Sequence, residues 1–182
     1  MKKLEENIER VLLTEEQLAV KVKEIAAQMG EYYKGEEVVV VCILKGSVTF
    51  FSDLVRALPF PVIYDFMCVS SYGSGTVSGG SVHIKKDLSV DIAGKHVVVI
   101  EDILDTGNTL TALFAKLQER KPASLKLCCM LDKPDRRQKP IYADFVGYQI
   151  PDEFVVGYGL DYDEKYRQLP YVGVLKRSVY EN

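Results

Sequence analysis

The chain has 182 residues, of which 47% are hydrophobic and 27% are charged. This composition is typical of one compact globular domain, with a core large enough to need no disulfide or metal staple. The 23 basic and 26 acidic side chains give a formal net charge of −3, which excludes a chain built to coat nucleic acid or an anionic membrane. Any polyanion that the protein binds must therefore be held by a local site.

The cysteines and histidines form no recognisable metal or disulfide pattern. The four cysteines lie within apolar runs, without a C-x-x-C pair or histidine partners at metal-ligand spacing, and we interpret them as buried free thiols: Cys42, Cys68, Cys128 and Cys129. His83 and His96 stand singly beside predicted strand ends, and we interpret both as structural or surface residues.

The N-terminal ten residues are charged and contain no apolar segment ahead of a small-residue cleavage site. No later stretch approaches the roughly 20 apolar residues that span a bilayer. We therefore expect a cytoplasmic protein.

The first predicted element is a helix from about residue 15 to Gly30. Residues 14–17, Thr-Glu-Glu-Gln, form a capping box, and apolar residues follow at helical spacing: Leu18, Val22, Ile25 and Met29. Residues 37–44 then form a β-branched run without alternation, as expected of a strand that is buried on both faces of a parallel sheet. Ser47 can cap a second helix, which we expect to run to about Leu58, where Pro59 and Pro61 stop it.

A second strand is predicted from Val62 to Ser70, followed by a Gly/Ser-rich loop over residues 72–81 that we expect to be mobile. A short strand near residues 82–86 returns from this loop as one arm of a ribbon. The strongest strand, Lys95 to Ile100, leads through an acidic turn into a helix that ends near Arg120. Further strands are predicted at residues 124–131, 144–150, 154–158 and 171–175. This alternation predicts an α/β fold with a doubly wound, mainly parallel sheet flanked by helices.

In such sheets, ligands bind beyond the carboxyl ends of the strands. There, residues 105–109, Asp-Thr-Gly-Asn-Thr, offer successive backbone N–H groups and two hydroxyls at the start of a helix, which suits a phosphate monoester. Glu101 and Asp102 come just before, and adjacent carboxylates can bind a sugar diol or a hard cation such as Mg²⁺. Together they predict a site for a ribose 5-phosphate, and an acidic loop that merely caps its helix remains the alternative at this point.

Residues 97–109 resemble the phosphoribosyl pyrophosphate signature of the type I phosphoribosyltransferases. The likeness covers nearly the whole chain after the first helix, and further segments follow in the order found in the hypoxanthine-guanine branch of that family: Leu44-Lys45-Gly46, Ser71-Tyr72, Lys133, Pro151 to Tyr162, and Arg167. The resemblance implies one phosphoribosyltransferase domain over residues 1–182, with a small hood formed from the chain-terminal segments. It also implies a homodimer or homotetramer.

The resemblance further implies a pentosyltransferase of purine salvage, which joins hypoxanthine or guanine through N9 to phosphoribosyl pyrophosphate and releases pyrophosphate. Pyrophosphate would lie on the loop Leu44-Lys45-Gly46, where the family often has a cis peptide before the lysine, and on Arg167. Mg²⁺ would be the cofactor, held by Glu101, Asp102 and Asp161. The phosphoribosyl group would be bound by Glu101, Asp102, Asp105, Thr106, Gly107, Asn108 and Thr109.

On the purine side, Asp105 would act as the general acid or base near N7. Lys133 would donate to the 6-oxygen, which favours hypoxanthine and guanine over adenine. Phe154 would stack on the purine with Ile103 on the other face, and the remaining purine contacts would come from the Val155 backbone and from Asp161.

The loop at about residues 71–82, beginning with Ser71-Tyr72, would be a lid that shields the reacting centre from water. Asn108 departs from the family, whose close members often carry a larger or cationic residue there, so the role of its side chain stays open. Two other functions also stay open: a xanthine-preferring enzyme, and a non-catalytic regulator of the same fold that binds nucleic acid. The acidic balance and the lack of room for a DNA-binding domain disfavour the regulator.

Overall fold

The computed structural model describes residues 2–71 and 82–181. The loop over residues 72–81, and with it most of the expected lid, lies outside the described residues. The elements in chain order are α1 (Lys2–Glu5), β1 (Ile8–Leu13), α2 (Glu15–Tyr33), β2 (Val38–Leu44), α3 (Val48–Ala57), β3 (Val62–Ser71), β4 (Val82–Lys86), β5 (His96–Leu104), α4 (Asn108–Gln118), β6 (Ser124–Asp132), the 3₁₀ turn η1 (Pro134–Arg136), β7 (Phe145–Gln149), β8 (Val155–Val156), β9 (Val172–Leu175) and α5 (Arg177–Tyr180).

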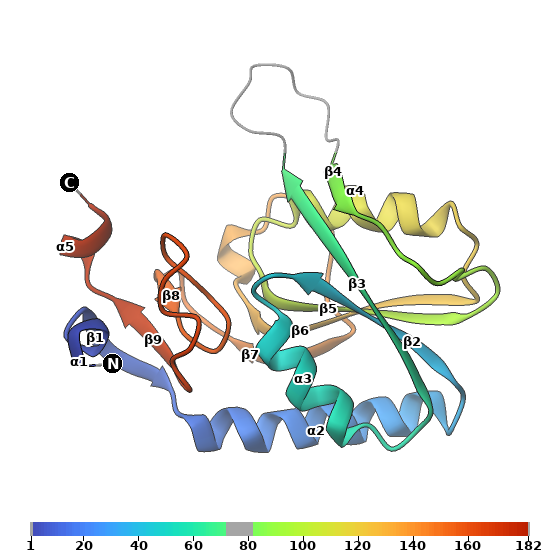
Figure 1. The fold of residues 1–182 in the computed structure, drawn as a ribbon, viewed down its shortest axis with the longest axis horizontal. Coiled ribbons are helices and arrows are strands. Elements are labelled where there is room, and N and C mark those ends of the chain that lie inside the picture. Colours follow the sequence, from blue (N-terminus) through green and yellow to red (C-terminus); the bar gives the residue numbers. More distant parts are fainter. Residues whose placement is uncertain (1, 72–81, 182) are drawn as a thin grey trace.

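The main sheet has the strand order β4-β3-β2-β5-β6-β7. All neighbouring strands are parallel except β4, which runs antiparallel to β3 and so forms the predicted ribbon arm. Helices α2 and α3 cover one face of this sheet and α4 covers the other, as Figure 1 shows. The predicted doubly wound α/β fold is confirmed.

The uninterrupted apolar run of β2 is explained by burial on both faces. Val38 and Val40 point into the core layer beneath α2 and α3, whereas Val39 and Val41 point into the layer beneath α4. Burying each such side chain stabilises the fold by roughly 1.5–3 kcal/mol relative to leaving it exposed. A strand in this position has no solvent-facing side that would require polar residues.

A second, three-stranded sheet stands apart at the end of the molecule that carries both chain termini (Figure 1). Its order is β1-β9-β8, and both pairings are antiparallel. This is the hood that the resemblance implied. The last two predicted strands thus belong to the hood rather than to the main sheet, and β1 is a strand that the sequence pattern did not predict.

Two local predictions were wrong. Helix α2 passes through Gly30 and ends three residues later, where Lys34 adopts a left-handed conformation (φ 51°) and donates its N–H to the Gly30 carbonyl. Glycine is needed at position 30 for packing, because a Cβ there would lie 2.6 Å from Cγ of Pro59. Ser47 does occupy the N-cap position of α3, but its hydroxyl donates to the Ile43 carbonyl instead of capping the helix.

The predictions for the cysteines and for His96 agree with the structure. All four cysteines are free thiols, three of them buried and Cys68 partly buried. His96 is held by a hydrogen bond between its Nδ1 and the hydroxyl of Ser124, which are 2.7 Å apart. None of the described helices is both long enough and apolar enough to cross a membrane.

Candidate active site

Two pockets open where the parallel strands end and the hood begins. The first has a volume of about 430 Å³ and is lined by Ile103, Asp105, Lys133, Phe154 and Val155, among others. We call it the base pocket. The second has a volume of about 380 Å³ and is lined by the loop over residues 44–46, by Glu101 and Asp102, and by Asp161 and Arg167. We call it the diphosphate pocket.

Residues 105–109 join the two pockets. Asp105 lines the base pocket and Thr109 lines the diphosphate pocket. Helix α4 begins at Asn108, and its N-cap is Gly107 in a left-handed conformation (φ 80°), so Asp105 does not cap the helix. The first N–H groups of α4 have no partner within the helix and are directed at its open end, as an anion site requires. This loop therefore has the geometry that a phosphate site requires, between the two pockets.

The carboxylates Glu101 and Asp102 form the floor of the diphosphate pocket. They lie within β5, because the strand continues to Leu104 instead of ending at Ile100 as predicted. Burial raises the pKa of Glu101 well above its usual range, and the neighbouring Asp102 adds to this. Burial also raises the pKa of Asp102 to about 6, although hydrogen bonds from backbone N–H groups and the charge of Arg167 oppose the shift. The pocket floor thus holds two carboxylates that are costly to ionise without a ligand.

The loop over residues 44–46 packs directly on this floor. The peptide bond between Leu44 and Lys45 is cis, as the resemblance led us to expect. A Cβ on Gly46 would lie 1.7 Å from Oδ2 of Asp102, so only glycine allows the loop to approach so closely. Lys45 extends outward, where its Nζ lies 3.0 Å from Oε1 of Glu164. The backbone of the loop, rather than the lysine side chain, faces the carboxylates.

Arg167 enters the diphosphate pocket from the hood. Its Nη1 donates to the Gly159 carbonyl at 2.8 Å, and its Nη2 lies 2.9 Å from Oδ1 of Asp161. Asp161 thus lines the diphosphate pocket and is not among the residues that line the base pocket, where the resemblance also placed it. The position of Asp161 suits a cation or phosphate contact better than a purine contact.

The base pocket has one buried cation. Lys133 is only 7% exposed, and its Nζ donates to the Glu153 carbonyl at 2.6 Å. Burial lowers the pKa of Lys133, although Asp105 and Asp152 oppose this shift. An ammonium group held at such a buried position is a directional donor for a carbonyl oxygen of a ligand.

The aromatic wall of the base pocket is formed by Phe154, which is 38% exposed. Its ring stacks on Tyr180 of α5, with a centroid distance of 4.8 Å and an interplanar angle of 24°. Tyr180 also lines the pocket. No motif predicted Tyr180 as part of the site, because the chain offers no local signal that residue 180 returns to residue 154.

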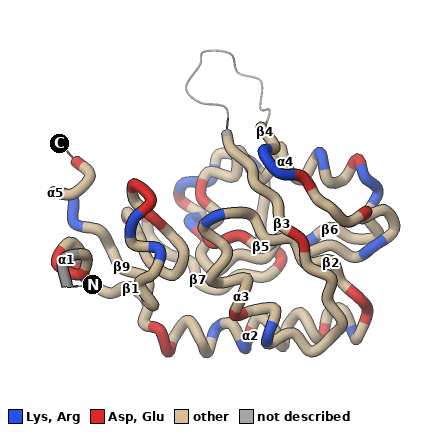
Figure 2. The backbone as a smooth tube through the Cα atoms, in the orientation of Figure 1, with Lys and Arg blue, Asp and Glu red and all other residues tan. Residues whose placement is uncertain are grey.

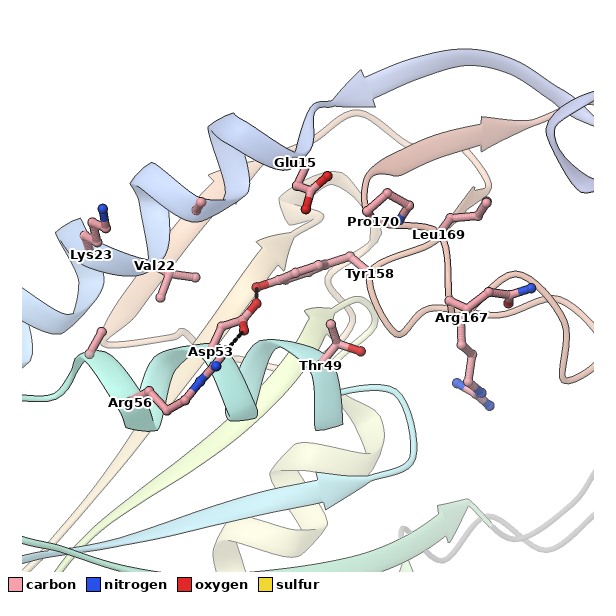
Figure 3. Close-up of a pocket in the computed structure, with 13 residues that line it drawn as sticks. Glu15, Val22, Lys23, Thr49, Asp53, Arg56, Tyr158, Arg167, Leu169 and Pro170 are labelled. Atoms are coloured by element: carbon pink, nitrogen blue, oxygen red, sulfur yellow. Dashed lines mark hydrogen bonds and ion pairs between the residues drawn. The ribbon is translucent and has the colours of Figure 1, made fainter. Parts of the chain in front are cut away.

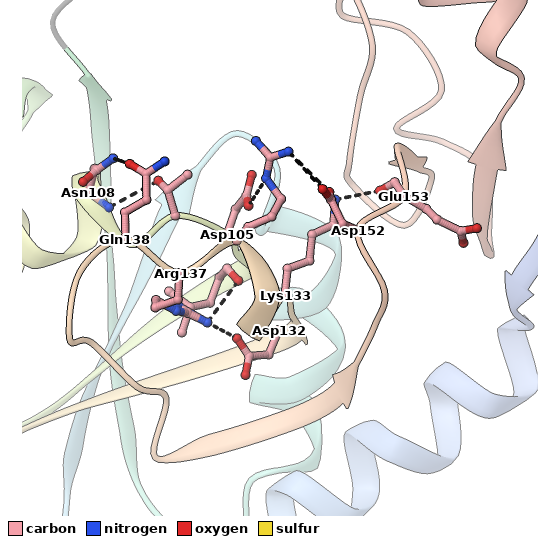
Figure 4. A network of polar contacts seen from close by, with 11 residues as sticks. Asp105, Asn108, Asp132, Lys133, Arg137, Gln138, Asp152 and Glu153 are labelled. Carbon is pink, nitrogen blue, oxygen red and sulfur yellow. Dashed lines mark hydrogen bonds and ion pairs between the residues drawn. The ribbon is translucent and has the colours of Figure 1, made fainter.

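Figure 4 shows a polar network behind the loop that joins the pockets. Nε of Arg136 lies 2.8 Å from Oδ1 of Asp105, and its Nη1 lies 3.3 Å from Oδ1 of Asp152. Arg137 forms a buried ion pair with Asp132. The motifs did not predict these arginines as part of the site; their position immediately after the end of β6 was the available signal.

The same network contains Asn108, whose side-chain role the resemblance left open. Its Nδ2 donates to Oε1 of Gln138 at 2.8 Å, and the backbone N–H of Gln138 donates to the Thr106 carbonyl at 2.9 Å. A Cβ on Gly107 would lie 2.6 Å from Ile141, so the segment after β6 packs closely against the loop. The Asn108 side chain therefore braces the loop from outside.

The carboxylates fit a divalent cation that arrives with its ligand. Among the described residues, no three His, Cys, Asp or Glu side chains are grouped closely enough to hold a metal by themselves. Mg²⁺ usually keeps several waters and is bound by one or two carboxylates together with substrate phosphates. Glu101, Asp102 and Asp161 line one pocket and suit this mode of binding. Of the expected lid residues, Tyr72 lies outside the described residues, and of Ser71 the structure describes only the strand backbone.

The fold, the loop at the start of α4 and the paired carboxylates define a protein that transfers or binds a phosphoribosyl group. The model of the phosphoribosyl transferase domain matches residues 11–163, and the chain belongs to this family.

Named relatives match nearly the full chain. The hypoxanthine-guanine phosphoribosyltransferase of Staphylococcus aureus strain Mu50 is 52% identical, covering 97% of this chain and 98% of the relative. That of Bacillus subtilis strain 168 is 47% identical, covering 98% and 99%. A crystal structure of a hypoxanthine phosphoribosyltransferase from S. aureus matches with a TM-score of 0.95 at 51% identity, covering 98% of this chain and 97% of the other.

Proposed function

We propose that this protein is a pentosyltransferase of purine salvage, which transfers the 5-phosphoribosyl group from phosphoribosyl pyrophosphate to N9 of hypoxanthine or guanine. The observation that supports this most is the pair of pockets joined by residues 105–109, with a buried lysine in one pocket and Arg167 in the other. A ribose 5-phosphate on the joining loop would place its anomeric carbon between a base and a diphosphate.

The diphosphate pocket would bind the leaving group. The backbone of the loop over residues 44–46 and the guanidinium of Arg167 would contact pyrophosphate, and Glu101 and Asp102 would accept hydrogen bonds from the ribose hydroxyls. Mg²⁺, when bound with the donor, would neutralise phosphate charge and fix the donor's geometry. Glu101, Asp102 and Asp161 are the residues that would hold it.

The base pocket would orient the nucleophile. Lys133 would donate to the 6-oxygen of the purine, and Phe154 and Ile103 would hold its two faces. Asp105 would take the proton from N7, or return it, as N9 attacks the anomeric carbon. An amino group at position 6, as in adenine, cannot accept the hydrogen bond from Lys133, and this supports the choice of 6-oxopurines.

We further propose that residues 1–182 act as one phosphoribosyltransferase unit that assembles into homodimers or homotetramers. The regulator alternative finds no support in the charge distribution. Figure 2 shows Lys and Arg interspersed with Asp and Glu along the chain.

The direct test is to incubate the protein with phosphoribosyl pyrophosphate and Mg²⁺ and, separately, hypoxanthine, guanine, xanthine, adenine or uracil. Chromatography then measures each nucleotide. We expect inosine and guanosine monophosphates, with little product from adenine or uracil. Conversion of another base without either of these products would contradict the proposal.

A further inference from the structure

Tyr158 is a buried residue to which neither the fold nor the proposed chemistry has given a role. It is 7% exposed and borders a third cavity, of about 620 Å³, between α2, α3 and residues 167–170. Its hydroxyl donates to Oδ2 of Asp53 on α3 at 2.8 Å, as Figure 3 shows. This hydrogen bond is part-buried, and a bond between a phenol and a carboxylate is stronger than most neutral pairs and restrains both partners.

The backbone around Tyr158 forms a tight turn. Tyr158 has a φ of 49°, and its neighbours Gly157 and Gly159 have φ values of 95° and 100°. A tyrosine rarely adopts this left-handed conformation, so its surroundings must hold it there. The turn is paired with the segment that carries Arg167, because Tyr158 N–H donates to Leu169 and Gly159 N–H donates to the Arg167 carbonyl at 3.0 Å.

The same turn contacts both parts of the diphosphate pocket. The carbonyl of Gly159 accepts a hydrogen bond from Nη1 of Arg167 at 2.8 Å. The α-carbon of Gly159 also packs on the loop over residues 44–46, since a Cβ there would lie 1.9 Å from the Gly46 carbonyl oxygen. Asp53, which holds the tyrosine, is on α3, the helix that begins at Val48 directly after that loop.

We propose that Tyr158 is a positioning residue, which through Asp53 tethers the turn at residues 157–159 to α3 and thereby aims Arg167 at the diphosphate of the donor. This inference rests on the proposed function, because it assigns pyrophosphate to that pocket. The tether joins the hood, which supplies Arg167, to the main sheet, which supplies the loop over residues 44–46. Besides this tether, only backbone contacts and the exposed ion pair between Lys45 and Glu164 are seen to join the two halves of the pocket within the described residues.

The test is Tyr158→Phe, which removes the hydroxyl and keeps the ring in the cavity wall. We expect KM for phosphoribosyl pyrophosphate to rise about tenfold, because Arg167 loses a fixed orientation toward that substrate. KM for hypoxanthine should stay within about twofold of the wild-type value, since the base pocket does not contain the tether. Steady-state kinetics with each substrate varied in turn measures both.

The matched control is Tyr33→Phe. Tyr33 is also buried, at 3% exposure, and its hydroxyl finds no hydrogen-bond partner within the described residues. It lies at the end of α2 in the core layer between that helix and the sheet, outside both pockets, so both KM values should match the wild type.

A second pair of variants tests Asp53, the hydrogen-bond partner of Tyr158. Asp53→Asn keeps an acceptor for the phenol and should lose less affinity for phosphoribosyl pyrophosphate than Asp53→Leu.

The outcomes separate the two proposals. Wild-type protein that converts neither hypoxanthine nor guanine would contradict the proposed function itself. Active wild type together with an unchanged donor KM in Tyr158→Phe would overturn only the positioning role. Equal rises in both KM values, or a loss of thermal stability without a change in either, would also overturn it, because a merely structural role produces that pattern.

Discussion

Acidic side chains at two places in the main sheet have pKa values that are shifted in opposite directions. Asp65 on β3 is buried, yet it accepts hydrogen bonds from the backbone N–H groups of Phe66, Ser89 and Val90 and from Nζ of Lys86. Burial alone would raise the pKa of Asp65, but these donors outweigh it, and the pKa lies below its usual value.

Glu101 and Asp102 at the end of β5 show the opposite balance. Burial dominates, and the pKa of both groups is raised. This difference is consistent with a structural role for Asp65 and with the ligand-binding role proposed for Glu101 and Asp102. Asp65 accepts four hydrogen bonds from its own chain, whereas Asp102 accepts one from Ile103, and we propose that sugar hydroxyls and a cation would stabilise the charged forms of the β5 pair.

The largest effect is expected at the site. Asp105→Ala should lower turnover by about 10²–10⁴-fold, because no other carboxylate of the base pocket is placed on the joining loop to exchange a proton with N7. KM for the donor should change little, since the backbone cup is kept. Asp135→Ala is the matched control: Asp135 is exposed on η1, and it should leave turnover unchanged. Turnover in Asp105→Ala that equals the wild-type value would contradict the proposed role of Asp105 as general acid or base.

The next largest effect tests whether Asp65 stabilises the fold. Asp65→Ala should lower the free energy of unfolding by about 3 kcal/mol, because it leaves several backbone N–H groups without their acceptor. Urea denaturation measures this, and turnover per folded molecule should stay near the wild-type value. Because the folded pKa is lowered, the contribution of Asp65 is present at neutral pH and is lost as pH falls below about 4. A variant as stable as the wild type at pH 7 would contradict this assignment.

Asp102→Asn should act in the opposite direction. The folded pKa of about 6 exceeds the ordinary value of 3.8, so the folded protein binds more protons than the unfolded chain between these values. The free energy of unfolding therefore falls as pH rises from about 4 to 6. The variant lacks this loss and should be about 1–2 kcal/mol more stable than the wild type at pH 7.5, with no advantage below pH 4.

Denaturation at both pH values checks the Asp102 prediction. Asp102 contributes to the raised pKa of Glu101, so its removal also eases the ionisation of Glu101, which acts in the same direction and adds to the variant's advantage at neutral pH. Parallel stability profiles for wild type and Asp102→Asn would show that Asp102 does not carry the predicted charge penalty.

The smallest effect concerns Asn108. Asn108→Ala removes the hydrogen bond to Gln138, which is exposed, and should cost about 0.5–1 kcal/mol of stability. Donor KM should rise less than about threefold, because the backbone cup and Gly107 remain. A double-mutant cycle with Gln138→Ala isolates the pair, and a coupling energy near zero would mean that the brace is not formed in solution.

The sequence predicted those elements whose signal lies within a short stretch of the chain. The buried strands, the capping box of α2 and the loop over residues 105–109 follow from patterns within about ten residues. Strand β1 could not be predicted in this way, because its pairing partner β9 lies some 160 residues away and its own sequence is short and charged. The end of α2 was missed for a similar reason: Gly30 is present for its contact with Pro59, which the local sequence does not reveal.

The site follows the same rule. Residues named from the motifs do line the two pockets, among them Lys45, Asp105 and Lys133. Arg136 and Tyr180 were missed, because they reach the pocket through tertiary contacts with Asp105 and Phe154 rather than through any motif. Asp161 lines the diphosphate pocket, where it pairs with Arg167, so its predicted purine contact stays a prediction.

The most direct test of the whole account is a crystal structure of the protein with inosine monophosphate. We predict the 5′-phosphate on the N–H groups of residues 105–109, the ribose hydroxyls on Glu101 and Asp102, and the purine 6-oxygen within hydrogen-bonding distance of Lys133 Nζ. A nucleotide bound with its phosphate on the loop over residues 44–46, or outside both pockets, would contradict it.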